Sequence, residues 1–147
     1  MRVAAVNKKA FYDYFILEEF TAGIVLTGNE VKAVREGRIN LKDSYVRIKN
    51  GQSFIVNVHI SEYSKSSKID DYNPRRVRKL LLHKKEINRL SVKTKEKGLS
   101  VVPIEVFFSK KGFAKAKIAL VKGKKTYNKK EIIKKRDIER ELKNEQK

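Results

Sequence analysis

Histidine is the side chain that most readily exchanges protons near neutral pH, and this chain has two, His59 and His83. His59 lies in an alternating apolar and polar run, and His83 lies at the start of an expected helix. Neither has a serine or carboxylate nearby in a known catalytic pattern, so we interpret both as structural or surface residues. A P-loop and metal-ligand spacing are also absent from the sequence. We expect a protein that is not an enzyme and has neither cofactor nor metal.

Positive charge is the chemistry that the sequence offers instead. The 147 residues include 36 Lys and Arg against 17 Asp and Glu, a formal net charge of +19. Small soluble domains usually carry a net charge of about 2–8 in magnitude, so a surface that is basic only for solubility is the weaker interpretation. Nucleic acid is the commonest cellular polyanion and would relieve the repulsion. The composition therefore predicts binding to RNA or DNA.

The basic residues form three clusters, each of which is a weak signal by itself. One cluster precedes Leu80–Leu82 and comprises Arg75, Arg76, Arg78 and Lys79. Lys84 and Lys85 follow these leucines. A basic strip continues at Lys115, Lys117, Lys122, Lys124 and Lys125. The aromatic residues Tyr12, Tyr63 and Tyr127, if exposed, could stack on unpaired bases, which favours folded RNA over DNA.

Most of the first 121 residues have strand patterns. Phe11–Phe20 is rich in aromatic and β-preferring residues, and residues 44–60 predict a hairpin around Asn50-Gly51, which is typical of a type I′ turn. Residues 99–121 predict two further strands, with one apolar and one basic face on the second. Ser61–Pro74 has the composition of a loop.

Two short helices are expected between these strands. Thr27 can cap the first, with Glu30 three residues later, and Gly37 would end it. The second would span residues 80–98, from LLLH to Gly98. We therefore predict a mainly β fold, a small antiparallel OB-like barrel with two or three short helices; periodicity alone leaves another α+β arrangement open.

The last 26 residues, 122–147, differ from the rest of the chain. They contain eleven Lys and Arg, five Asp and Glu, and only four large apolar residues. Such a segment cannot order itself by burial. We expect two parts: an RNA-binding barrel over residues 1–121, and a basic tail over residues 122–147 that is disordered alone and helical when docked on RNA.

The sequence has no cysteine, which fits a reducing compartment. It shows neither a signal peptide at its start nor a run of about 20 apolar residues. We expect a cytoplasmic, monomeric protein that does not bind membranes.

Several stretches resemble the SmpB family, the bacterial partners of transfer-messenger RNA. They occur in the family's order, cover nearly the whole chain and are specific together. The stretches are NKKAFYDYFILEEFTAGIVLTGNEVKAVREG, NLKDSYVRI, PRRVRKLLLHKKEI, KEKGLSVVP and KGKKTYNKKEIIKKRDI.

This resemblance implies a function. Members of the family bind the tRNA-like domain of transfer-messenger RNA and bring it to stalled ribosomes. Trans-translation then rescues the ribosome and tags the nascent peptide for degradation. The basic tail is implied to enter the decoding centre and the empty mRNA channel of the ribosome.

The resemblance and the basic clusters together predict two sets of contacts. RNA-binding contacts are expected at Thr21, Glu30, Lys32, Arg76, Lys79, Leu81, His83, Lys84, Lys115, Lys117, Lys122, Gly123, Lys124 and Lys125. Contacts with the ribosome are expected at Tyr12, Tyr127, Asn128, Lys129, Lys130, Lys134, Lys135 and Arg136. For Glu30 a helix-capping role is an open alternative.

Three of these positions depart from the family pattern. Thr21 stands where relatives usually carry an acidic residue, Tyr12 where they often carry histidine, and Asn128 where many carry aspartate. Two rival functions share the same charge: a ribosomal or assembly protein that coats ribosomal RNA, and a general single-strand-binding OB protein.

Overall fold

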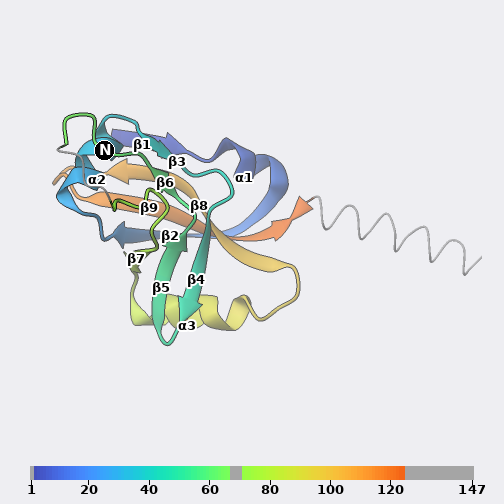
Figure 1. Ribbon diagram of the computed structural model, residues 1–147. Coiled ribbons are helices and arrows are strands. Elements are labelled where there is room, and N and C mark those ends of the chain that lie inside the picture. The colour runs from blue at the N-terminus through green and yellow to red at the C-terminus, as the bar shows by residue number, and fades with distance from the viewer. Residues whose placement is uncertain (1, 67–70, 125–147) are drawn as a thin grey trace, which may run out of the picture.

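The structure, a computed structural model, describes residues 2–66 and 71–124 of the chain. Its strands are β1 (Arg2–Val6), β2 (Tyr14–Ile24), β3 (Ile39–Asn40), β4 (Tyr45–Lys49), β5 (Gln52–Val56), β6 (His59–Ile60), β7 (Arg78–Leu81), β8 (Leu99–Phe108) and β9 (Ala114–Gly123). Seven of them form one antiparallel sheet in the order β1-β8-β9-β2-β7-β5-β4, and β3 pairs with β6 (Figure 1).

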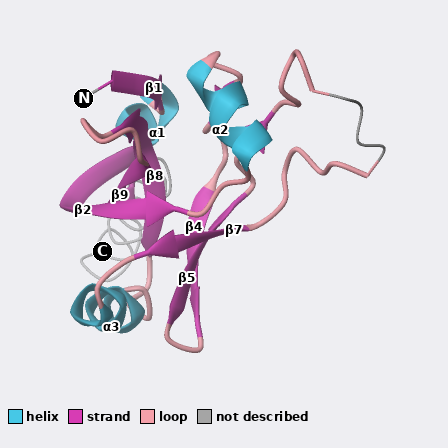
Figure 2. Cartoon of the chain, turned by 90° about the vertical axis from the view of Figure 1, so that its left-hand side faces the viewer, coloured by secondary structure: helices cyan, strands magenta, loops and turns pink. Residues whose placement is uncertain are grey.

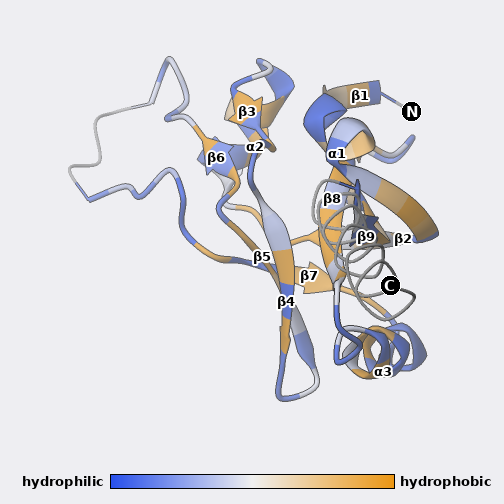
Figure 3. Ribbon diagram, turned by 90° about the vertical axis from the view of Figure 1, so that its right-hand side faces the viewer, coloured by the Kyte–Doolittle hydropathy of each residue, from blue (hydrophilic) through white to orange (hydrophobic). Residues whose placement is uncertain are grey.

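The large sheet curls on itself around one core. β4, at one end of the sheet, is in contact with β8, the second strand from the other end, although no ladder joins these two strands in the described residues. Ile55, Leu80 and Ile118 are buried inside the curl. Figure 3 shows the apolar residues gathered on the strands and the hydrophilic ones on the turns and the loop after β6. The predicted mainly β, OB-like fold is confirmed.

Within residues 2–66 and 71–124, three helices lie around this sheet: α1 (Lys8–Asp13), α2 (Gly28–Arg35) and α3 (Lys84–Lys93). In Figure 2, α1 lies beside β8 and β9, α2 next to the long loop between β6 and β7, and α3 at the opposite end of the sheet. Ala10 of α1 packs with Val102, Ile104, Ala119 and Val121 in a second, smaller cluster. None of the described helices has the length and apolar character needed to span a bilayer.

The prediction of a strand over Phe11–Phe20 is wrong at its start. Phe11 to Asp13 belong to α1, and the strand begins at Tyr14. Asn7 explains the helix, because its Oδ1 accepts a hydrogen bond from the Ala10 backbone N–H at 3.2 Å. A helix cap and the burial of Ala10 thus outweigh the β propensity of two aromatic residues.

The prediction of a helix over residues 80–98 is wrong at both ends. Leu80 and Leu81 belong to β7, where Leu80 faces Ser53 of β5 and Leu81 faces Gly23 of β2. The helix begins at Lys84, with His83 as its N-cap, and ends at Lys93. Pairing with β2 and β5, which are distant in sequence, makes Leu80 and Leu81 part of a strand instead of a helix. No local pattern could reveal this pairing. Strand β1 was not predicted either.

Other local signals are confirmed. Asn50 and Gly51 have φ angles of 52° and 71°, as a type I′ hairpin turn requires. Thr27 and Glu30 form a capping box: the Thr27 hydroxyl accepts from the Glu30 N–H at 3.2 Å, and Glu30 accepts from the Thr27 N–H at 2.9 Å. Such a cap contributes about 1 kcal/mol to helix stability.

Candidate nucleic-acid interface

Strands β7, β2 and β9 bring together residues that are far apart in sequence. Gly23 of β2 is the ladder partner of Lys115 on one side and of Leu81 on the other, and Thr21 is the partner of Lys117. Partners in antiparallel ladders point to the same face of a sheet. We call this face the three-strand surface and define it as Thr21, Gly23, Lys79, Leu81, Lys115 and Lys117.

Leu81 makes the centre of the three-strand surface apolar. Its side chain is 56% exposed, which is unusual for leucine in the middle of a sheet. It lies beside Gly23, with its Cβ and Cδ1 each 3.4 Å from the position that a β-carbon on Gly23 would occupy. Because Gly23 carries no side chain, Leu81 can lie against the backbone of β2 and still present one face to a ligand.

Three lysines surround this apolar centre. Lys79 is exposed, and Lys115 and Lys117 are partly exposed. None of the three forms an ion pair with any carboxylate in the described part of the chain, although Glu105 of β8 is the ladder partner of Lys117. The arrangement offers cations next to an apolar surface, as RNA phosphates and unpaired bases require.

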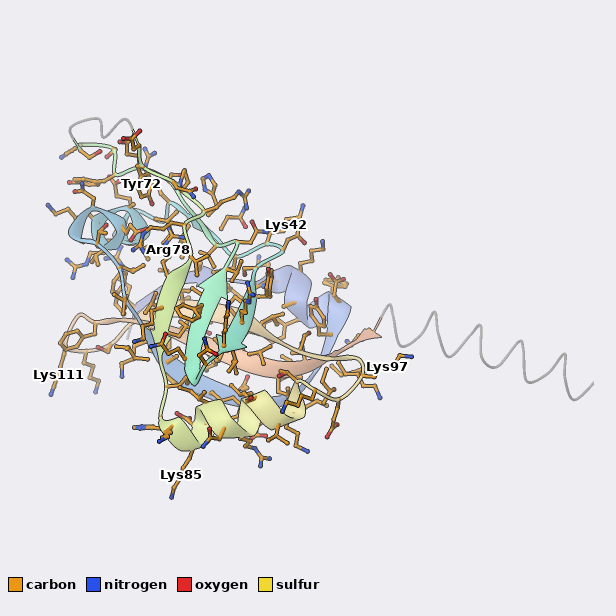
Figure 4. The ribbon with its side chains drawn as sticks, turned by 60° about the horizontal axis from the view of Figure 1, so that its bottom comes forward. Lys42, Tyr72, Arg78, Lys85, Lys97 and Lys111 are labelled. Carbon is orange, nitrogen blue, oxygen red and sulfur yellow. The ribbon has the colours of Figure 1, made fainter. Side chains whose placement is uncertain are left out.

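Glu30 lies at the centre of a buried ionic cluster below α2. The Arg78 guanidinium donates to Glu30 Oε2 through Nε at 2.8 Å and Nη2 at 2.6 Å. Arg76 Nε donates to the same oxygen at 3.1 Å, and its Nη2 contacts Oε1. The Tyr72 hydroxyl lies 3.3 Å from Oε2. Figure 4 shows Arg78 and Tyr72 close to α2.

This cluster holds the loop between β6 and β7 to the barrel. Arg78 also donates to the carbonyls of Val58 at 2.7 Å and Pro74 at 3.0 Å. Arg78 and Glu30 have side chains only 1% exposed. Arg78, which the sequence analysis placed in a basic cluster for nucleic acid, is therefore not available to a ligand, and the structure favours the capping and structural role for Glu30. Arg78 lies two positions before the buried Leu80, so the two side chains share the inner face of β7.

The pKa of the Glu30 carboxyl lies below its ordinary value. Burial acts to raise the pKa, but hydrogen bonds from Arg76, the Thr27 backbone and Arg78 outweigh that effect. Burial also raises the pKa of the Tyr72 hydroxyl, with the Glu30 charge acting in the same direction. Glu30 is therefore ionised at neutral pH and anchors the two guanidinium groups.

Other predicted RNA-binding residues lie outside the three-strand surface. His83 and Lys84 are exposed where β7 passes into α3. Arg76 is partly exposed, with its guanidinium on Glu30. Lys32 of α2 is exposed, and its Nζ lies 5.5 Å from the centre of the Tyr63 ring. Tyr63 itself is only partly exposed, because it packs against the main core.

A second group lies at the far end of β9. Gly123 is the ladder partner of Tyr14, and Lys122 that of Phe15. The Nζ of Lys124 lies 5.1 Å from the centre of the Phe15 ring and 3.3 Å from the Phe11 carbonyl oxygen, to which it donates. Tyr12, on α1, is 83% exposed. Lys115 and Lys122 are seven positions apart on β9, a distance of about 23 Å along a strand.

Basic side chains also cover other parts of the molecule. In Figure 4, Lys85 lies on α3 and Lys97 in the segment between α3 and β8. Lys111 lies at the turn between β8 and β9, and Lys42 in the segment between β3 and β4. Several predicted contacts lie outside the described residues, and for them the predictions stand as made: Lys125, Tyr127, Asn128, Lys129, Lys130, Lys134, Lys135 and Arg136.

The sequence analysis missed Gly23 and Phe113 as members of the candidate interface. Phe113, the residue before β9, is 63% exposed and lies next to the three-strand surface. Its place after Gly112, in a turn followed by a basic strand, was the available signal. No sequence signal marked Gly23, because its role in the interface depends on Leu81, which lies on the strand that pairs with it.

Comparisons with known proteins agree on one family. The family model described as "SmpB protein" matches residues 4–147. The SsrA-binding protein of Shouchella clausii is 55% identical over 141 residues, covering 96% of this chain and 89% of that protein. That of Thermosipho melanesiensis is 51% identical over 142 residues, covering 97% and 96%.

A solved structure agrees with these sequence matches. A chain in a structure described as "tmRNA-SmpB: a journey to the center of the bacterial ribosome" is similar, with a TM-score of 0.71 and 42% sequence identity. The match covers 84% of this chain and 85% of that one.

Proposed function

This chain belongs to the SmpB protein family, and from that premise we propose that it binds transfer-messenger RNA and delivers it to stalled ribosomes. Its partners are the tRNA-like domain of that RNA and the ribosome, where trans-translation tags the nascent peptide for degradation. The family is one of RNA-binding proteins, and the proposed role is binding without catalysis. Because the ribosome is the site of action, the proposed location is the cytoplasm.

The observation that carries the proposal is the meeting of Thr21, Leu81 and Lys115 on one face. All three are among the RNA-binding contacts that the family resemblance and the basic clusters predict, and the ladder register supports that prediction. The Thr21 hydroxyl would hydrogen-bond a ribose 2′-OH or a base edge there, where an acidic side chain is usual. Rigid strands suit the recognition of one RNA shape.

The proposal divides the chain between two tasks. The barrel, which extends to the end of β9 at Gly123 and so two residues beyond the boundary expected from the sequence, reads the RNA. The basic segment that follows it contacts the decoding centre and mRNA channel. The distance of about 23 Å along β9 between Lys115 and Lys122 supports this division, since it separates the grip on the tRNA-like domain from the start of the tail.

The proposed function predicts a preference among RNAs. At physiological salt the chain should bind transfer-messenger RNA more tightly than ordinary tRNA or generic RNA, and its affinity should fall steeply as salt rises because counterions are released. Filter binding or calorimetry with the three RNAs measures this. A protein that coats ribosomal RNA, or a general single-strand-binding protein, would show no such preference, and equal affinities would exclude our proposal.

Lys115→Ala tests the three-strand surface directly. We expect the free energy of RNA binding to weaken by about 1 kcal/mol, because one phosphate contact is lost. The melting temperature should not change, since Lys115 makes no ion pair with the described carboxylates.

Lys97→Ala is the matched control. Lys97 is an exposed lysine in the turn before β8, on the α3 side of the molecule (Figure 4). The substitution Lys97→Ala therefore removes the same charge as Lys115→Ala, at a position away from the three-strand surface. An equal effect of the two substitutions would mean that binding depends on net charge and not on this face.

A further inference from the structure

An open hollow lies at one end of the three-strand surface, where β2 runs past the end of its ladder with β9. Its volume is about 500 Å³, within the range of ~300–1,000 Å³ typical of pockets for small ligands. Its rim includes Val25, Leu81, Phe113 and Lys115. We call it the β2–β9 hollow. Three of these four side chains are apolar and exposed: Val25 by 46%, Leu81 by 56% and Phe113 by 63%.

Phe113 is held firmly although it is exposed. The Ser109 N–H donates to the Phe113 carbonyl at 2.9 Å, and the Phe113 N–H donates to Ser109 Oγ at 3.2 Å. The Gly112 N–H donates to the Ser109 carbonyl at 2.8 Å, and Gly112 has a φ of 85°, which favours glycine. The turn between β8 and β9 thus fixes the backbone that carries the ring, so that binding costs little ordering entropy.

The charge around the hollow decides which ligand fits it. Lys115 lies on the rim, and Lys79 lies beside Val25, whose N–H donates to the Lys79 carbonyl at 2.9 Å. A second copy of the chain would bring its own net charge of +19 to this face and be repelled. A nucleotide has the required chemistry, because its base presents a flat π face to apolar side chains and its phosphate is anionic. Stacking of a base on an aromatic ring tolerates any base.

We propose that the β2–β9 hollow holds one unpaired base of the bound RNA, stacked on Phe113 and covered by Leu81, with the neighbouring phosphate on Lys115. This inference rests on the proposed function and names the part of the RNA that the three-strand surface grips. It makes Phe113 a binding residue and explains why a rigid turn presents an exposed phenyl ring beside two lysines.

Substitutions at Phe113 test the hollow. Phe113→Ala should raise the dissociation constant for the isolated tRNA-like domain about tenfold, because one stacked base contributes about 1–3 kcal/mol. Phe113→Trp should keep the affinity, and Phe113→Leu should lose most of it despite its apolar side chain. Val92→Ala on α3, where Val92 is 64% exposed, is the control for exposed apolar area and should bind as the wild type does. Thermal unfolding checks that all variants fold.

Abasic RNAs identify the base. Each unpaired nucleotide of the tRNA-like domain is replaced in turn by an abasic one. We expect one position whose loss costs the wild type about tenfold in affinity and costs Phe113→Ala nothing further.

Two outcomes would overturn the hollow as a base site: fully additive losses at every position, or wild-type affinity of Phe113→Ala. Either result could occur while the wild type still prefers transfer-messenger RNA, so failure of this inference is distinguishable from failure of the proposed function.

Discussion

Arg78→Met is expected to lower the free energy of unfolding by about 3 kcal/mol, because it breaks a buried ion pair and leaves Glu30 with fewer partners. The carbonyls of Val58 and Pro74 lose their donor as well. Methionine keeps much of the volume of the arginine stem, so the loss reflects charge and hydrogen bonds more than a cavity. Chemical denaturation at pH 7, monitored by circular dichroism, measures the change.

The pH dependence separates this explanation from a loss of packing. In the wild type the folded-state pKa of Glu30 lies below its ordinary value of 4.5, so its contribution is present above that pH and is lost as the pH falls through the folded pKa. In Arg78→Met that pKa is higher, because a stabilising cation is gone. The difference in stability between the two proteins should therefore shrink below about pH 4.5. A constant difference would mean that packing causes the loss.

Arg75→Met is the matched control for this substitution. Arg75 is exposed, and its Nη1 donates to Asn57 Oδ1 at 2.8 Å without contacting Glu30. Substitutions at exposed positions usually change stability by at most about 0.5 kcal/mol. If Arg75→Met destabilised the protein as much as Arg78→Met, burial of the Glu30 cluster would not be the cause.

Deletion of Tyr127–Lys147 is expected to abolish peptide tagging on stalled ribosomes and to leave binding to isolated transfer-messenger RNA nearly unchanged. The segment is too poor in apolar residues to pack on the barrel, so its removal should cost the barrel little. Its lysines and arginines would instead neutralise ribosomal RNA phosphates in a channel that lacks mRNA. RNA binding and tagging in a reconstituted translation system are the two measurements.

A shuffled tail is the control for this deletion. A chain with the residues of Tyr127–Lys147 in random order keeps the length and charge of the tail but loses its spacing. It should bind the isolated RNA as the wild type does and tag stalled peptides poorly. If the deletion weakened RNA binding as much as tagging, the tail would belong to the primary RNA site, and the proposed division of the chain would be wrong.

The strand ladders of the barrel fix both the three-strand surface and the point at which the tail begins. The three-strand surface is built on paired strands, so its lysines and Leu81 are positioned before RNA binds. Lys122 and Gly123 lie in the last part of β9 and are fixed by the ladder with β2. Strand β9 therefore links both functions, and substitutions that disturb its ladder should affect RNA binding and tagging together.

The sequence by itself determined the features that depend on near neighbours. Asn50-Gly51 specified its hairpin, and Thr27 and Glu30 specified the start of α2. Two strands were correctly predicted in residues 99–121, the second from its alternation of apolar residues with lysines. Each depends on residues within a few positions of one another, where propensity and hydrogen bonding act directly. Charge and the ordered motifs determined the partner class and the family.

Only the tertiary structure decided the features that depend on distant segments. Leu81 became part of a strand because Gly23 pairs with it, and Arg78 became buried because Glu30, 48 residues away, accepts its hydrogen bonds. Phe11 entered a helix because Asn7 caps it and Ala10 packs on β8 and β9. The free energy of these contacts comes from partners that no local window contains, so a residue's exposure and role follow from the sheet that surrounds it.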